Sequence, residues 1–256
     1  GKLGEVVADA FIDGLLNGYK LVATLSRTID KARYIADKVN KANYNKECVA
    51  CNNIDELLAL KPNYIVEIAT PAVFKNFALK AITNGASIVT LSIGALADEQ
   101  FYRDVEKTAH KYGVKVHIPS GAIGGLDLMR TATLMGETKV RFDTEKSWKP
   151  LRGTQLYDEK LETMSCQVFN GNAKEAIAIL PTQVNVAVAA SLATVGTENV
   201  EVTIATTPHY KGDKHTITLK NSEVDATLDI YSQTSNIAGW SVVHTLRNIA
   251  SSIVFG

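Results

Sequence analysis

The chain has 256 residues, of which 46% are hydrophobic, so it can bury the core of one large domain or of two smaller ones. Its 27 basic and 27 acidic residues cancel, and no block of one sign argues for a nucleic acid or an anionic membrane as partner. No apolar run approaches the roughly 18 residues of a membrane span. Cys48, Cys51 and Cys166 have no second Cys or His pair at zinc spacing, so we expect reduced thiols, no metal site and a cytoplasmic protein.

Helix and strand patterns alternate in the first half of the chain. Short, mostly apolar strands between helices are typical of a parallel sheet that is covered on both faces. The expected helices are 5–17, 28–40, "NIDELLAL", 72–84 and 98–112, and the expected strands are 21–26, "ECVAC", 64–70, 87–92 and "KVHIP".

The pattern changes after about residue 136. Strands there alternate between apolar and polar side chains, which indicates a second α+β domain on a mostly antiparallel sheet with one open face. We therefore expect a dinucleotide-binding domain at 1–125, a substrate domain at 126–237 and a C-terminal helix, 238–256, that packs back near the junction. The strands are "VRFDTE", "TMSCQVFN", "VEVTIATT", "KHTITLK" and "VDATLDIY", and the helices are about 173–179, 184–194 and 238–251.

The chain opens with "GKLG", in which Gly1 and Gly4 match the second and third glycines of a G-x-G-x-x-G turn. Such a turn follows a strand and opens a helix whose N–H groups meet the pyrophosphate of a dinucleotide. A GxxG at a helix start also occurs for packing reasons, but the alternating elements behind it favour a doubly wound Rossmann sheet. We expect its first strand, roughly 8–10 residues with the turn, to lie ahead of Gly1.

The end of the second strand of such a sheet reports on the ribose of the cofactor, because an acidic residue there binds the 2′-hydroxyl of NAD. This chain has Ser26, Arg27 and Thr28 instead. Hydroxyls and a guanidinium suit a 2′-phosphate, so the pattern favours NADP, with NAD still open. A surface arginine in a loop is the alternative interpretation.

Several stretches make the chain resemble the L-aspartate dehydrogenase family. The most specific is "IPSGAIGGLDLMRTA" (118–132), and the resemblance runs through nearly the whole chain from Gly1. The supporting stretches are "LSIGALAD" (91–98), "TEKSWKPLRGT" (144–154), "FNGNAKEAIAILPTQVNVAVAASLA" (169–193) and "TTPHYKGDKHTI" (206–217). The resemblance implies a Rossmann domain joined to an α+β catalytic domain, which interconverts aspartate and iminosuccinate with NAD or NADP.

The resemblance also implies roles for three residues. Ala122 matches the residue whose backbone lies against the nicotinamide end of the cofactor, Asn185 a cofactor-contacting asparagine, and His215 the catalytic histidine. Each has a structural alternative. The glycines around Ala122 can serve a tight strand-to-helix turn, Asn185 can cap a helix, and His215 can be an ordinary buried histidine on a strand.

The substrate of such an enzyme has two carboxylates, which need cations or N–H groups. Lys146 and Arg152 are candidates for this role, and Asp213 lies beside His215 on the expected strand. Asp213 replaces an asparagine that is common in the family, and "SNIAGWS" (235–241) replaces a lysine-containing segment. Another small amino or oxo acid as substrate, or a cofactor-binding sensor without turnover, therefore stays open. The open sheet face would suit a homodimer.

Overall fold

The computed structural model describes residues 1–42, 47–181 and 184–255, and the chain folds into two compact units. Unit 1 comprises Gly1–Ser92, Gln100–Pro119 and Ala238–Gly256, and unit 2 comprises Ile93–Glu99 and Ser120–Ile237. The C-terminal helix thus contributes to unit 1. The segments 93–99 and 120–125, which were expected in the first domain, lie in unit 2.

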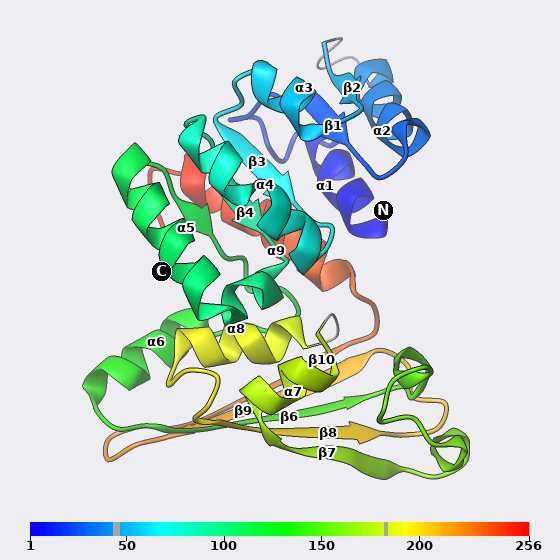
Figure 1. Ribbon diagram of the computed structural model, residues 1–256, viewed down its shortest axis with the longest axis vertical. Helices are drawn as coiled ribbons and strands as arrows, with labels where there is room; N and C mark the ends of the chain where they lie inside the picture. The colour runs from blue at the N-terminus through cyan, green and yellow to red at the C-terminus, as the bar shows by residue number, and fades with distance from the viewer. Residues whose placement is uncertain (43–46, 182–183, 256) are drawn as a thin grey trace. The chain divides into compact units, whose positions relative to one another are not determined.

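Unit 1 holds parallel strands in two separate sheets (Figure 1). β1 (Ala23–Leu25) pairs with β2 (Val49–Cys51), while β3 (Tyr64–Glu67), β4 (Ser87–Thr90) and β5 (Val116–His117) form the second sheet in that order. Among the described residues, no strand of one sheet pairs with a strand of the other.

The helices of unit 1 begin where the local sequence favours a helix start. The Thr70 hydroxyl accepts a hydrogen bond from the backbone N–H of Val73, and Pro71 occupies the first turn of the helix that follows. The helices that lie wholly or largely in unit 1 are α1 (Lys2–Ile12), α2 (Ile29–Lys41), α3 (Ile54–Ala59), α4 (Pro71–Thr83), α5 (Glu99–Tyr112) and α9 (Asn236–Ala250).

A hydrophobic core joins α1 and α9 to β4. Gly239 allows the close approach of the two helices, because a Cβ on it would lie 3.0 Å from the Cβ of Val6. The buried members of this core are Val7, Ala10, Leu16, Val89, Val242, Val243 and Leu246.

Unit 2 is built on one mixed sheet in the order β10-β9-β6-β8-β7, in which β6 and β8 run parallel and the other neighbours antiparallel. Helices α7 and α8 lie over one face of this sheet (Figure 1), which confirms the open-faced α+β expectation. The strands are β6 (Lys139–Lys146), β7 (Cys166–Asn172), β8 (Val200–Thr206), β9 (Asp213–Lys220) and β10 (Asp225–Ser232). The helices are α6 (Leu126–Met135), α7 (Ala173–Ile179) and α8 (Asn185–Ala193), with 3₁₀ turns η1 (Ile93–Ala97), η2 (Lys149–Leu151) and η3 (Glu159–Glu162).

The inward face of this sheet changes from apolar to polar along the strands. Alternate residues of β6, β8 and β9 point to this face, and the strand register groups them into four rows, in which every residue but the half-buried Asp213 is buried. In order, the rows are Val140–Val200–Leu219, Phe142–Val202–Ile217, Thr144–Ile204–His215 and Lys146–Thr206–Asp213. The first two rows form a core, so the polar side chains collect at one end of the face.

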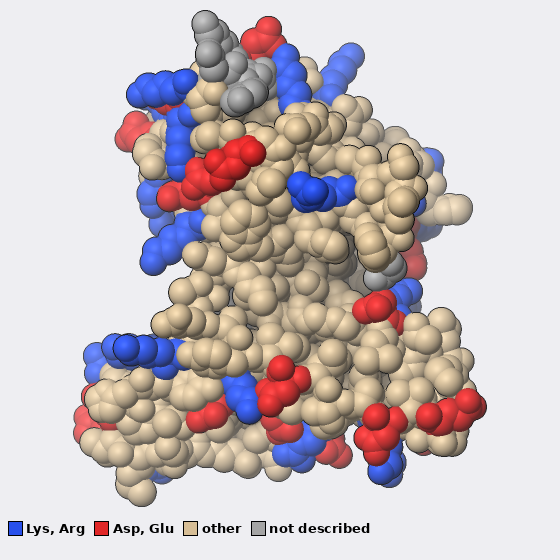
Figure 2. All heavy atoms as spheres, turned by 180° about the vertical axis from the view of Figure 1, so that it is seen from behind, with Lys and Arg blue, Asp and Glu red and all other residues tan. Residues whose placement is uncertain are grey.

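The opposite face of the sheet carries charged side chains in pairs. Lys214 bridges to Asp229 at 3.1 Å, and Arg141 to Asp143 at 2.8 Å. Basic and acidic side chains are interspersed on the surface that Figure 2 shows. This mixture agrees with the zero net charge of the sequence.

Candidate active site

His215 lies in the first of the two polar rows, beside the apolar core, and only 3% of its surface is exposed. Its Nδ1 atom is 3.0 Å from the hydroxyl oxygen of Thr144, which faces it across the β6–β9 pair. The ring of Phe142 stacks on the imidazole at a centroid distance of 5.6 Å and an interplanar angle of 30°. The imidazole is therefore held on two sides within the sheet.

Burial lowers the pKa of His215 to about 4. The nearby charge of Lys146 also lowers this pKa, whereas the Asp213 carboxylate raises it. Desolvation thus outweighs the effect of the carboxylate. At neutral pH His215 is thus an uncharged imidazole, which can accept a proton.

Lys146 and Asp213 are register partners in the last row, next to His215. Among the described residues, Lys146 is the only buried lysine or arginine. Burial lowers the pKa of its ammonium, and Asp213 raises it. Beside it, the Thr206 hydroxyl is fully buried and has no hydrogen-bond partner. The Asp213 carboxylate offsets part of the cost of burying the Lys146 ammonium.

The loop around Ala122 is held against the same sheet. Gly121 and Gly125 adopt the left-handed region, at φ +64° and +69°. A Cβ on Gly125 would lie 2.7 Å from a methyl carbon of Leu228 on β10, so a side chain there would have to displace Leu228 and adopt a strained backbone. The loop therefore lies over the strand next to that of His215 and leads into α6.

Asn185 opens α8, but its side chain does not cap that helix. Its oxygen accepts a hydrogen bond of 3.0 Å from the backbone N–H of Gly94 in η1. Since the oxygen is engaged in this way, the amino group is the part of the side chain suited to a ligand. Helix capping, the alternative interpretation, does not describe this residue.

The residues expected to meet the pyrophosphate and the ribose of the cofactor lie in unit 1, whereas Ala122 and Asn185 lie in unit 2. Gly1 is the N-cap of α1, and a Cβ on Gly1 or Gly4 would meet no atom within 4 Å. Ser26 and Arg27 follow β1, and Thr28 is the N-cap of α2 without a side-chain capping bond. Glycines at a helix start and a polar strand end fit a dinucleotide, so these residues suit NAD(P).

Arg152 has other contacts. Its guanidinium donates to Glu162 at 2.7 Å and lies over the rings of Trp148 and Tyr157, at 5.1 and 5.7 Å. The side chain is exposed. A role in substrate binding stays a prediction that these contacts do not support.

The sequence singled out neither Thr144 nor Glu67. Thr144 could not be found by spacing, because 71 residues separate it from His215. Glu67 is a buried carboxylate at the end of β3 that accepts from Thr90 Oγ1, Ser92 Oγ and the N–H of Ala69, at 2.5, 2.9 and 2.7 Å. It joins the segments that follow β3 and β4. The sequence feature that could have singled out Glu67 is an acidic residue at the end of an otherwise apolar strand.

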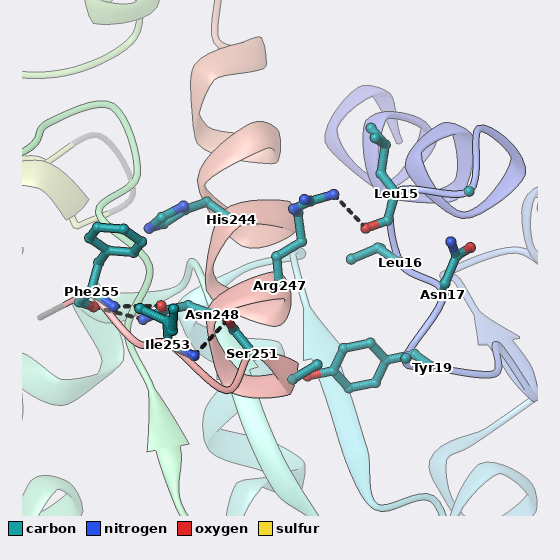
Figure 3. Close-up of a pocket in the computed structure, with 13 residues that line it drawn as sticks. Leu15, Leu16, Asn17, Tyr19, His244, Arg247, Asn248, Ser251, Ile253 and Phe255 are labelled. Carbon is teal, nitrogen blue, oxygen red and sulfur yellow. Dashed lines mark hydrogen bonds between the residues drawn. The ribbon is translucent and has the colours of Figure 1, made fainter.

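Figure 3 shows a pocket of about 440 Å³ in unit 1, between α9 and the segment after α1. Arg247 donates to the carbonyl oxygen of Leu15 at 3.0 Å, and Asn248 pairs with the backbone of Phe255 at 2.8 and 2.9 Å. These polar groups already bind the chain's own backbone, and the lining residues all belong to unit 1, whereas His215 belongs to unit 2. The pocket is not part of the candidate site.

The cysteine pair also lies outside the site. Cys48 and Cys51 are buried free thiols, and burial raises the pKa of Cys48 to about 11, so it is protonated. In residues 1–42, 47–181 and 184–255, no three His, Cys, Asp or Glu side chains are grouped as metal ligands. No helix among them is long and apolar enough to cross a membrane.

Two protein-family models match the chain. Residues 127–249 match "Aspartate dehydrogenase, C-terminal", and residues 1–119 match "Homoserine dehydrogenase, NAD binding domain". The L-aspartate dehydrogenase of Methanococcus maripaludis is 28% identical over 100% of this chain and 96% of its own length. That of Acinetobacter baylyi is 30% identical over 75% of this chain and 77% of its own.

A solved structure agrees with these matches. The crystal structure of aspartate dehydrogenase from Thermotoga maritima is similar with a TM-score of 0.64 and 31% identity, over 76% of this chain and 78% of that one. The identity and the coverage exceed what a shared fold alone produces. Together with the sequence matches, they establish that the chain belongs to the L-aspartate dehydrogenase family.

Proposed function

We propose that the chain is an NAD(P)-dependent oxidoreductase that interconverts L-aspartate and iminosuccinate, with His215 as its acid–base residue. The observation that carries the proposal is the buried imidazole of His215 in the row next to the buried side chain of Lys146, in a chain of this family. Water then converts the imine to oxaloacetate and ammonia.

In this proposal some residues bind the cofactor, and His215 transfers the proton. Gly1 and Gly4 would receive the pyrophosphate at the start of α1, and Ala122 and Asn185 the nicotinamide end. The nicotinamide, when bound there, would supply the acceptor for the hydride from the substrate Cα. His215 accepts a proton from the substrate amine and can return one in the reverse direction.

Lys146 is the residue that we assign to a substrate carboxylate. Its ammonium is buried beside His215, and the neighbouring Thr206 hydroxyl can add a hydrogen bond. Asp213 opposes this role because it is a like charge for an anionic substrate. For that reason a neutral or cationic amino acid is the second candidate substrate.

The test is an assay of the purified protein with L-aspartate and NAD or NADP, followed by the absorbance of the reduced nicotinamide. Aspartate should be the best substrate among aspartate, asparagine, alanine and lysine. Faster turnover of asparagine or lysine would transfer the proposal to the second candidate. Tight cofactor binding without turnover of any of them would favour a sensor.

We propose NADP as the cofactor that binds at least as well as NAD, since Arg27 follows β1 and no acidic residue does. A charge-assisted contact to the 2′-phosphate corresponds to a roughly tenfold to hundredfold preference. Arg27→Ala should weaken NADP binding by that factor and leave NAD binding unchanged in fluorescence titrations. Equal losses for both cofactors, or none, would contradict the assignment. Arg33→Ala, on the exposed side of α2, is the matched control.

A cytoplasmic homodimer completes the proposal. Free cysteines support the location, since Cys48, Cys51 and Cys166 form no disulfide. The open sheet face of unit 2 is the proposed interface. Its charged pairs, Arg141–Asp143 and Lys214–Asp229, would make polar contacts with the second copy of the chain. Analytical ultracentrifugation at several protein concentrations decides between a dimer and a monomer.

A further inference from the structure

The contact between Thr144 and His215 has a consequence for the proton chemistry. We propose that Thr144 is a positioning residue that holds His215 in the tautomer with its proton on Nδ1, so that Nε2 keeps its lone pair for the substrate. The inference rests on the proposed function, because it concerns the residue that would move the proton.

The strand register sets this contact. Thr144 and His215 are direct partners in the antiparallel β6–β9 pair. Side chains in such positions have Cβ atoms about 4.5–5.5 Å apart, so a short hydroxyl reaches the near ring nitrogen, Nδ1, and not the far one. The observed distance of 3.0 Å between Thr144 Oγ1 and His215 Nδ1 is that of a hydrogen bond. Both side chains are buried, so water is a poor substitute for either partner.

The ring of His215 is also fixed in its plane. Phe142 stacks on it, and Ile230 is its register partner on β10. A half-turn of the imidazole would place a carbon atom against the Thr144 hydroxyl and leave a buried nitrogen without a partner. The stacking and the hydrogen bond therefore favour the same orientation.

The direction of the hydrogen bond decides what the ring can do. An uncharged imidazole has one N–H donor and one acceptor nitrogen, while a hydroxyl can play either part. If Nδ1–H donates to Thr144, Nε2 can take a proton from the substrate amine and pass it on to water. The imidazolium that forms still donates through Nδ1, so the contact persists in both protonation states. If the hydroxyl donated instead, Nε2 would carry the proton and could not act as a base.

Few charges act on this ring. Asp213, on β9, and Lys146, on β6, are the titratable groups whose charges shift its pKa. Its partner on β10 is Ile230, and α8 has no titratable side chain between Asn185 and Ala193. Removing the Thr144 oxygen takes away an acceptor from the imidazolium, which should move the acidic limb of kcat/KM to lower pH.

Thr144→Val tests the hydroxyl at nearly constant shape. We expect kcat with aspartate to fall about 10- to 100-fold, the range seen when the partner that orients a ligating histidine is removed. The Kd of the cofactor should stay within twofold, and Thr144→Ser should restore most of kcat. Thr133→Val is the control, because it makes the same change in α6, where the hydroxyl bonds to its own helix at Met129. Wild-type kcat in Thr144→Val would overturn the proposal.

The ¹⁵N chemical shifts of the imidazole in labelled protein read the tautomer directly, without turnover. We expect a protonated Nδ1 and an unprotonated Nε2 in the wild type, and a loss of this preference in Thr144→Val. A protonated Nε2 in the wild type would overturn the proposal even if Thr144→Val failed to fold. If the wild type does not oxidise aspartate, the proposed function fails, while the chemical shifts still decide the tautomer.

Discussion

The imidazole of His215 is uncharged because it is buried, although a carboxylate lies two residues along the same strand. Burial favours the neutral ring, whereas Asp213 favours the charged one, and burial prevails, so that the pKa falls to about 4. This state suits a base that must accept a proton near pH 7, because nearly every molecule then has a ring nitrogen with a free lone pair.

The depressed pKa of His215 makes the stability of the protein depend on pH. Below its ordinary pKa of 6.5, the unfolded chain binds a proton that the folded chain does not bind until about pH 4. The free energy of unfolding should therefore fall as the pH falls through this window. From pH 7 to pH 5 the loss attributable to His215 is roughly 2 kcal/mol.

Urea unfolding of the wild type and His215→Gln at both pH values measures this loss. The variant should lose roughly 2 kcal/mol less than the wild type, because glutamine does not titrate. An equal loss in both proteins would show that His215 keeps an ordinary pKa in the fold.

Asp213→Asn should improve the reaction with aspartate. Removing a like charge a few ångströms from a dicarboxylate is worth about 1 kcal/mol or more, so KM should fall about fivefold. The pKa of His215 should fall further, because the carboxylate that raises it is gone, and the acidic limb of kcat/KM should move to lower pH. Asp229→Asn, which makes the same change on the open face of the sheet, should alter neither quantity. An unchanged KM and pH profile in Asp213→Asn would place this carboxylate outside the site.

At the scale of single residues, the sequence predicted which residues share a strand face better than it predicted which side chains contact each other across strands. Asp213 and His215 were correctly expected on one strand, because residues two apart face the same side. The burial of His215, which lowers its pKa, could not be read from the sequence, since burial depends on how the sheet is covered. Thr144 was missed because the register between β6 and β9 sets its contact, and no spacing within one strand encodes that register.

Among the elements, the start of β9 depends on one glycine. Gly212 has a φ of +78°, and a Cβ on it would lie 2.1 Å from the carbonyl oxygen of Ser232 and 2.8 Å from the Cα of Gln233. Gly212 thus lets the loop before Asp213 approach the end of β10 closely. Any side chain there must push the two strands apart at the polar end of the sheet.

Gly212→Ala should therefore reduce both stability and activity. The left-handed backbone and the clash together should lower the free energy of unfolding by roughly 2–5 kcal/mol, as measured in urea. Gly196→Ala is the matched control, because its φ is +84° and its Cβ would meet no atom within 4 Å. The control should lose only about 1–2 kcal/mol. Similar losses in both variants would mean that the close approach to Ser232 is not needed.

The elements themselves were largely predictable. The helix at 173–179 appears with the expected bounds. Of the three long strands after it, β9 and β10 alternate between the two faces as expected, whereas β8 has a further buried residue at Thr203. The strands of unit 1 are shorter than expected, such as Tyr64–Glu67 within 64–70, because hydropathy continues past the last paired residue. The division of the parallel strands into two sheets could not be predicted from the sequence and is seen only in the structure.

At the scale of the whole molecule, the chain passes between the two units several times. Residues 93–99 leave unit 1 for unit 2 and return, which a single boundary near Gly125 does not describe. Hydrophobic patterns reveal elements but not which core each element joins. Family membership, by contrast, was recognisable from the sequence, because the glycine-rich loop and the His215 segment are local patterns.

The central claim is that His215 moves the proton in the oxidation of aspartate. The most direct test is the kcat of His215→Ala with aspartate and NAD(P), measured beside the Kd of the cofactor and with His209→Ala as control. The variant should bind the cofactor as the wild type does, while kcat falls by about 10²- to 10⁴-fold, and His209→Ala should change little. Near-normal turnover by His215→Ala, with cofactor binding intact, would contradict the account.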